Sequence, residues 1–135
     1  MAQDFTWLLE NLMEAVPHTR GALLLSGDGM IECYRGVDEN NAARDAAMAS
    51  AICSLASAWS RETDGNGTIG QVMMELPKAI VVITAASVNT VLAVVSDTAV
   101  DAGLLGHEMA QLGKQLRAAL ATPARRPAGN GLPSQ

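Results

Sequence analysis

Few residues in this chain have the types and the spacing that catalysis requires. Ser26 lies in Ser26-Gly27-Asp28-Gly29, which is typical of a tight turn and not of the strained strand-to-helix elbow that exposes a nucleophilic serine. The two glycines do not indicate a phosphate loop either, because neither a helix start nor a lysine follows them. The segment therefore predicts a hairpin turn without chemistry of its own.

Four side chains could bind a metal ion, but their positions in the sequence argue against a site. His18, Cys33, Cys53 and His107 never pair at the spacing of about two to four residues that would place two ligands beside one metal. Asp97 and Asp101 flank the expected start of a helix, where capping explains them better than acid catalysis. We expect no catalytic residue, no metal, no cofactor and hence no enzyme.

Composition argues against further classes of function. The 135 residues are 49% hydrophobic and 17% charged, with a net charge of -5, which fits one compact domain. Basic residues are scattered except for Arg125 and Arg126, and aromatic residues make up 3%, so we expect no nucleic-acid surface. Met1 to Asp4 lack a secretory pattern, and the uncharged stretch 79–96 contains polar residues. We therefore expect a cytoplasmic protein without direct membrane insertion.

The sequence predicts a regular succession of helices and strands. Apolar periodicity and turn residues predict helices over about 5–16, 38–61 and 100–121, and strands over 22–25, 30–35, 68–76, 79–86 and 89–96. Short links favour antiparallel neighbours, and the continuously apolar strands belong inside the sheet. We predict an α/β sandwich, a five-stranded antiparallel sheet of order 2-1-5-4-3 with helices on both faces, in the succession α-β-β-α-β-β-β-α. The domain covers 1–121, and the proline-rich residues 122–135 are predicted to be a disordered tail.

The second helix is the informative segment, because it has no charged residue from Ala46 to Ser60. At about 100° per residue, one side is a bulky stripe, which we expect to meet the sheet: Met48, Ile52, Leu55 and Trp59. The opposite side is small, and we expect it to pack against the same helix of a second copy: Ala42, Ala43, Ala46, Ala47, Ala49, Ser50, Cys53, Ser54, Ser57 and Ser60. The alternative is that alanine and serine were chosen there only for helix propensity and solubility.

The third helix contains three glycines, each of which costs up to about 1 kcal/mol relative to alanine inside a helix. Gly103, Gly106 and Gly113 are therefore expected to permit a close crossing against the first helix. Its apolar stripe is expected to be core and not a cofactor site.

Four segments together resemble a known family. They are Gly21-Ala22-Leu23-Leu24-Leu25-Ser26-Gly27-Asp28-Gly29, the alanine-rich second helix, Leu92-Ala93-Val94-Val95, and Leu104-Leu105-Gly106-His107-Glu108-Met109-Ala110. In this order and spacing, over about residues 4–121, the chain resembles the Roadblock family, relatives of dynein light chains and of the bacterial MglB regulators, and more narrowly the actinobacterial conservon B proteins.

The resemblance implies a homodimer in which second helices and third strands meet and join two sheets into one. It also implies binding of a small Ras-like GTPase, whose own loops are reshaped without a donated arginine, and membership of a membrane-proximal complex with a sensor kinase. Arg44 would then make a salt bridge or a rim contact in preference to acting as a finger. The expected dimer and partner interface comprises Arg44, Ala46, Met48, Ala49, Ser50, Ile52, Cys53, Leu55, Ser57, Gln71, Met73 and Glu75.

Two rival functions remain open. A small-molecule sensor domain would need polar groups that converge inside the fold, whereas the inward stripes are Leu, Val, Ile and Met. A hydrolase would need a base beside a nucleophile, and the sequence nominates neither.

Overall fold

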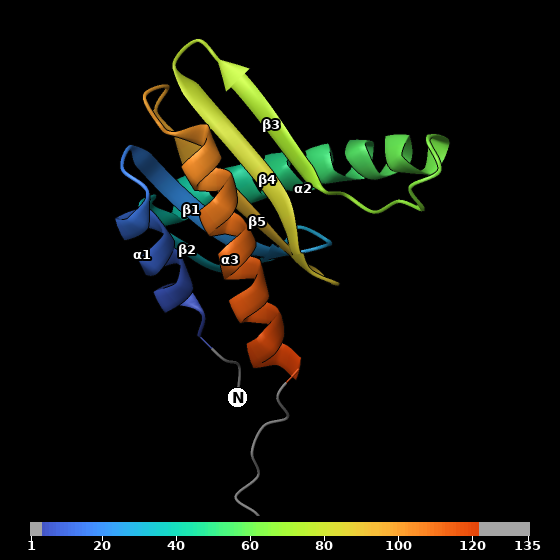
Figure 1. Ribbon diagram of the computed structural model, residues 1–135, viewed down its shortest axis with the longest axis horizontal. Helices are drawn as coiled ribbons and strands as arrows, with labels where there is room; N and C mark the ends of the chain where they lie inside the picture. Colours follow the sequence, from blue (N-terminus) through green and yellow to red (C-terminus); the bar gives the residue numbers. More distant parts are fainter. Residues whose placement is uncertain (1–3, 122–135) are drawn as a thin grey trace, which may run out of the picture.

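The computed structural model describes residues 4–121 and contains three helices and five strands in the predicted succession (Figure 1). In chain order these are α1 (Thr6–Ala15), β1 (Thr19–Ser26), β2 (Ile31–Arg35), α2 (Glu39–Glu62), β3 (Gln71–Leu76), β4 (Ala79–Ser87), β5 (Thr90–Ser96) and α3 (Ala102–Ala121). The tail predicted over 122–135 lies outside the described residues. None of the helices within 4–121 is both long and apolar enough to cross a membrane.

The five strands form one antiparallel sheet of order β2-β1-β5-β4-β3, which confirms the predicted topology. Leu23 of β1 pairs with Ala93 of β5, and Met73 of β3 pairs with Val82 of β4. The central strands are the continuously apolar ones, because both of their faces are covered. The strands of mixed polarity, β2 and β3, lie at the two edges.

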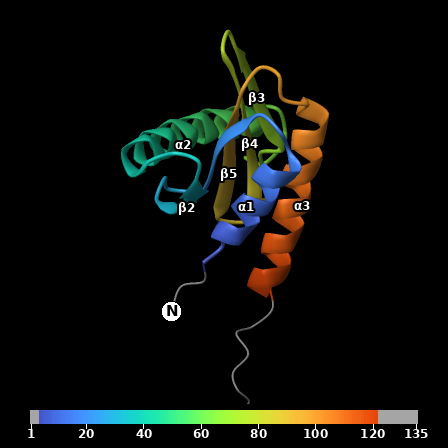
Figure 2. The ribbon, with the colours of Figure 1, turned by 90° about the vertical axis from the view of Figure 1, so that its left-hand side faces the viewer.

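The sheet separates two cores (Figure 2). Alternate residues of each strand point to opposite faces, so Leu24 and Val82 face α1 and α3 while Leu23 and Ile83 face α2. The larger core contains side chains from both of its helices: Leu8, Leu9, Leu12, Leu105, Met109, Leu112 and Leu116. Each such leucine, fully buried, contributes about 1.5–3 kcal/mol through removal of apolar surface from water.

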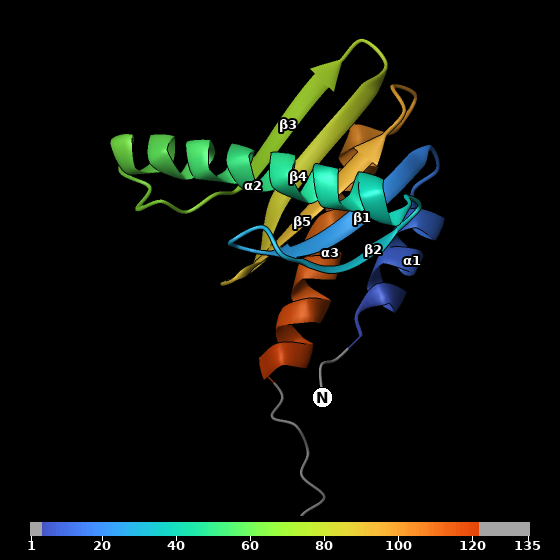
Figure 3. The same ribbon diagram turned by 180° about the vertical axis from the view of Figure 1, so that it is seen from behind.

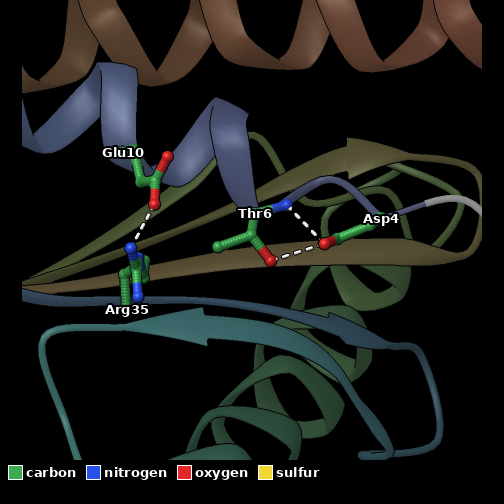
Figure 4. Close-up of polar contacts among 4 residues, drawn as sticks. All are labelled: Asp4, Thr6, Glu10 and Arg35. Atoms are coloured by element: carbon green, nitrogen blue, oxygen red, sulfur yellow. Dashed lines mark hydrogen bonds and ion pairs between the residues drawn. The ribbon is translucent and has the colours of Figure 1, made fainter.

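Polar contacts order the start of α1, and an ion pair links this helix to the edge strand β2 (Figure 4). Asp4 accepts hydrogen bonds from the backbone N–H of Thr6, at 2.9 Å, and from the Thr6 hydroxyl. The hydroxyl bond is the main cause of the lowered pKa of Asp4. Glu10 of α1 forms an ion pair with Arg35 of β2, which ties the helix to the edge strand.

Asp101 caps α3, as its position in the sequence predicted. Its side chain accepts a hydrogen bond from the backbone N–H of Leu104 at 3.0 Å, which satisfies one of the free donors at the helix start. The expectation that the glycines of this helix cross α1 closely is wrong, because the atoms nearest to a Cβ built at Gly103, Gly106 or Gly113 belong to other parts of the chain. Gly113 lies against Ala86 of β4, where a Cβ would stand 3.5 Å from the Ala86 carbonyl oxygen. The close approach is therefore between helix and sheet.

Candidate interaction surface

Helix α2 crosses the strands steeply, and its C-terminal part projects beyond the edge strand β3 (Figures 1 and 3). The Asp38 side chain caps its start by accepting a hydrogen bond from the backbone N–H of Asn41 at 2.8 Å. The projecting part has no strand of its own sheet beneath it. Any apolar side chain there must find cover from another molecule or remain in water.

The small side chains of α2, and not the bulky ones, pack on the sheet. Ala42, Ala46, Ala49 and Cys53 are buried and form one core with the following strand residues: Leu23, Leu25, Ile83, Val91 and Ala93. The prediction that the small side packs against a second copy is therefore wrong for these four residues, whereas Ala43, Ala47 and Ser54 of that side are exposed. The sheet supplies the large side chains at this contact, so only small residues on the helix let the two layers approach closely.

Of the bulky stripe of α2, only Ile52 packs against this core, and the other members point to solvent, which corrects the prediction that the stripe meets the sheet. Met48 is 53% exposed, Leu55 70% and Trp59 76%, while Ile52 is half-buried. Large apolar side chains that gather on one exposed face are typical of an interaction site. The helix thus leaves an apolar surface exposed, and of its residues Met48, Ile52 and Leu55 belong to the predicted interface whereas Trp59 does not.

An apolar groove runs beside the stripe, between α2 and the β3–β4 hairpin. Its volume is about 260 Å³. Met48 and Ile52 line it from the helix, and Met74 and Leu76 line it from β3. Asp45 lies at the same groove, where burial raises the pKa of its carboxyl although the nearby Arg44 acts in the opposite direction.

The three predicted residues of β3 lie on the other face of the sheet. Gln71, Met73 and Glu75 pair with Thr84, Val82 and Ile80 of β4, and Val82 and Ile80 belong to the core beneath α1 and α3. Within residues 4–121, β3 pairs only with β4. Its other edge therefore offers backbone N–H and C=O groups to a further strand.

The remaining predicted residues divide into two groups. Ala46, Ala49, Cys53 and Ser57 make contacts within their own chain, and the Ser57 hydroxyl donates a hydrogen bond to the Gly67 carbonyl oxygen at 2.8 Å. Ser50 is half-buried, whereas Arg44 is exposed.

Three residues of this surface were missing from the predicted interface: Trp59, Met74 and Leu76. The alternating three- and four-residue spacing of the bulky stripe was the signal that could have found Trp59, because it is typical of a seam between two helices. Met74 and Leu76 alternate along β3 with the predicted residues and therefore point to the opposite face of the sheet. The sequence did not show which of the two faces α2 covers, so it could not select them.

Among the side chains whose types could support catalysis or metal binding, the two cysteines are buried and Ser26 belongs to a turn. Cys33 and Cys53 are buried free thiols, and burial raises the pKa of Cys33 to about 11 and also raises that of Cys53. The Ser26 hydroxyl donates a hydrogen bond to Asp28 and accepts one from the Met30 N–H, so it belongs to the predicted turn. Across residues 4–121, no three His, Cys, Asp or Glu side chains are grouped to hold a metal ion.

A second hollow, of about 620 Å³, lies on the opposite flank of α2. Ser54 and Arg61 of the helix line it, together with Thr68 and the β4–β5 turn at Asn89. It combines hydroxyl groups, a guanidinium and apolar wall.

Comparisons with solved structures show the same fold in other proteins. A Roadblock/LC7 domain from Streptomyces avermitilis is 38% identical, with a TM-score of 0.82 over 89% of this chain and all of its own length. Myxococcus xanthus MglB is 16% identical, with a TM-score of 0.77 over 87% of this chain and 98% of its own. An MglB with tetrameric arrangement is 14% identical, with a TM-score of 0.75 over 84% and 85%. At such low identity, the likeness to MglB shows the fold alone.

The comparison with curated proteins found no significant match. The family described as Roadblock/LC7 domain matches residues 5–96, from α1 to the end of β5. This match includes α2, the groove and the open edge of β3. Because it spans more than half of the sequence, the chain belongs to the Roadblock/LC7 domain family.

Proposed function

We propose that this protein is a non-catalytic homodimeric adaptor that binds a small Ras-like GTPase in a bacterial signalling complex. The observation that carries the proposal is the exposed bulky stripe of α2 beside the unpaired edge of β3. A partner that covers both would remove apolar surface from water and complete the hydrogen bonding of the edge strand. A second copy does both with one interface, because a two-fold axis uses the same surface twice.

The energy available from this surface suits a stable dimer. Burial of a large apolar side chain contributes about 1.5–3 kcal/mol, and each exposed residue of the stripe is present twice in a symmetric pair. Met48, Leu55 and Trp59 therefore supply several such contributions. They offset the loss of translational and rotational freedom on association.

The family gives the proposal its direction. Roadblock/LC7 domains are a family of GTPase-regulating adaptors and are generally non-catalytic. An MglB structure has a tetrameric arrangement, so a protein with this fold does associate with itself. The resemblance to conservon B proteins supports a cytoplasmic, membrane-proximal complex with a sensor kinase as the setting.

The GTPase would dock on the outer surface of the paired helices. Arg44, Ala47, Ala51 and Ala58 are exposed and point away from the sheet at helical spacing. The three alanines form a low surface on which loops of a GTPase can lie. The protein would regulate the GTPase by holding these loops in one conformation, and Arg44 would make a contact at the rim of the interface.

The test is capture of a GTPase encoded beside this protein, in its GDP-bound and GTP-bound states, by the immobilised full chain. Ala47→Arg should abolish capture while light scattering still reports a dimer, because the change adds a long charged side chain to the outer surface only. Gln115→Arg is the matched control. Gln115 is exposed on α3, so this variant should leave capture unchanged. A chain that forms dimers yet captures the GTPase in neither state would overturn the GTPase assignment.

A small-molecule sensor is the second candidate function. The hollow beside Arg61 favours it, because a guanidinium and several hydroxyl groups converge on an apolar wall there. Loss of GTPase capture together with stabilisation of the chain by a small ligand would favour this alternative.

A further inference from the structure

The second hollow, on the flank of α2 opposite the apolar groove, has an apolar floor. Its volume of about 620 Å³ falls within the range of about 300–1,000 Å³ that is usual for small-molecule sites. Because α2 crosses the strands steeply, the sheet continues beyond the helix towards the β4–β5 turn (Figure 3). There Ala85 of β4 pairs with Val91 of β5, and both line the hollow together with Ile69. The fold therefore leaves this part of the sheet for a ligand to cover.

Hydrogen bonds fix the two walls of the hollow. One wall is the C-terminal part of α2 with the loop 63–70, which the Ser57 hydroxyl holds by donating to the Gly67 carbonyl oxygen at 2.8 Å. The other wall is the β4–β5 turn, where the Gly27 N–H donates to the Asn89 carbonyl oxygen at 3.0 Å. A ligand would thus meet walls that are already in place, which lowers the entropic cost of binding.

Arg61 is the one charged side chain that lines the hollow among the residues 4–121. Its guanidinium lies beside Gly67, where φ is +81° and a Cβ would stand 3.2 Å from Nη1 of Arg61. Glycine at this position therefore leaves room for the guanidinium. In the described part of the chain, the guanidinium forms neither an ion pair nor a hydrogen bond. Its donors can all turn to a ligand.

The charge around the hollow favours a ligand with a single negative charge. The planar guanidinium matches a carboxylate, with which it forms two parallel hydrogen bonds. Phosphate dianions are often bound by the N–H groups at the N-terminus of a helix. Here the helix end is instead the C-terminus of α2, which carries a partial negative charge of about half a unit. The net charge of -5 on the chain opposes a dianion further.

We propose that the second hollow binds a small monocarboxylate with an apolar body. The carboxylate pairs with Arg61, and the apolar body covers Ile69, Ala85 and Val91. The inference goes beyond the GTPase adaptor. It rests on the second candidate function and names the class of ligand for that site. The hollow and the apolar groove lie on opposite flanks of α2, so a ligand in the hollow leaves the edge of β3 accessible.

Calorimetric titration of the full chain with 3-phenylpropionate tests the class of ligand. The neutral isostere 3-phenylpropanamide should bind at least about tenfold more weakly, because it cannot form a charge-assisted pair with the guanidinium. Inorganic phosphate should also bind more weakly than the carboxylate. Equal affinities for acid and amide, tighter binding of phosphate, or no detectable binding of the acid at millimolar concentration would each overturn the proposal.

Two substitutions test the two halves of the site. Arg61→Gln should weaken binding of 3-phenylpropionate by about tenfold or more. Lys114→Gln removes the same charge from an exposed position on α3 and should leave binding unchanged. Ala85→Leu fills the floor from an exposed position, so it should block the acid and the amide alike. Circular dichroism checks the fold of each variant, and native affinity in either Arg61→Gln or Ala85→Leu would contradict the site.

Hydrogen exchange shows where the ligand lies. Bound 3-phenylpropionate should slow amide exchange in the segments 63–70 and 87–90, which form the two walls, and should leave the β3–β4 hairpin unchanged. Protection of the hairpin alone would place the ligand in the apolar groove and overturn the proposal.

The inference and the proposed functions fail in distinguishable ways. Native capture of the GTPase without carboxylate binding would leave the adaptor function intact and remove this site alone. A neutral ligand that protects the same amides, with no effect of Arg61→Gln, would retain the second candidate function and overturn the carboxylate. Carboxylate binding by a chain that captures no GTPase would support the site and count against the adaptor.

Discussion

At the scale of single residues, Gly36 shows how one backbone position lets the end of β2 lie close against β1 and α1. It follows β2 and has a φ of +83°, a conformation that side chains other than glycine rarely adopt. A Cβ at this position would collide with the Arg20 carbonyl oxygen and would stand 2.9 Å from Cε of Met13. The turn that starts the connection to α2 therefore requires glycine for two separate reasons.

Gly36→Ala should lower the free energy of unfolding by more than about 2 kcal/mol, because strain at positive φ adds to a collision with backbone. Urea denaturation followed by circular dichroism measures the change. Gly70→Ala is the matched control, since no atom lies within 4 Å of a Cβ built there and its φ is not positive. Its free energy of unfolding should stay within about 0.5 kcal/mol of the native value. Equal midpoints for the two variants would contradict this account of Gly36.

At the scale of elements, the sequence predicted the sheet more completely than the helix that lies on it. The segments Leu23–Leu25 and Val91–Val95 are apolar throughout, which indicates cover on both faces and places their strands inside the sheet. Short links then determined which neighbours pair. The edge position of β3 followed from its mixed polarity.

The orientation of α2 could not be predicted in the same way. Side-chain size distinguishes its two faces but does not decide which one meets the sheet. The usual expectation, that bulky residues point inward, fails because Leu23, Leu25 and Ile83 already fill the space between the layers. The orientation of α2 depends on how its side chains fit between those of the sheet. The sequence did not show which face of the sheet α2 covers.

Ala46→Leu tests this packing directly. Ala46 is 1% exposed against the sheet, so three extra carbon atoms must push the helix outward, at a cost of about 1–3 kcal/mol. Ala47→Leu introduces the same atoms on the exposed side and should change the free energy of unfolding by less than about 0.5 kcal/mol. Urea denaturation of both variants measures the difference. Greater destabilisation by Ala47→Leu would mean that the helix is turned the other way.

At the scale of the whole molecule, helices cover the two faces of the sheet to different extents. Helices α1 and α3 cover the face of the sheet that contains Leu24 and Val82, and the side chains of this core are buried. The opposite face has one helix, which crosses it steeply and leaves an apolar groove and a projecting end (Figure 3). The fold is thus stable on one side and incomplete on the other, which is where a second copy would contribute.

If a second copy completes this face, the stability of the protein depends on its concentration. A tenfold rise in concentration favours the dimer by about 1.4 kcal/mol, so the melting temperature should rise by roughly 3 °C for each tenfold step in differential scanning calorimetry. Leu55→Glu should abolish this dependence, because it places a charge in the bulky stripe of α2. The variant should nevertheless melt like the dilute native chain, since Leu55 is exposed in the single copy. Glu108→Gln, on α3, should retain the native dependence. A melting temperature of the native chain that stays constant from about 1 to 100 μM, the micromolar range in which dimers of modest affinity form, would mean that no second copy stabilises the open face.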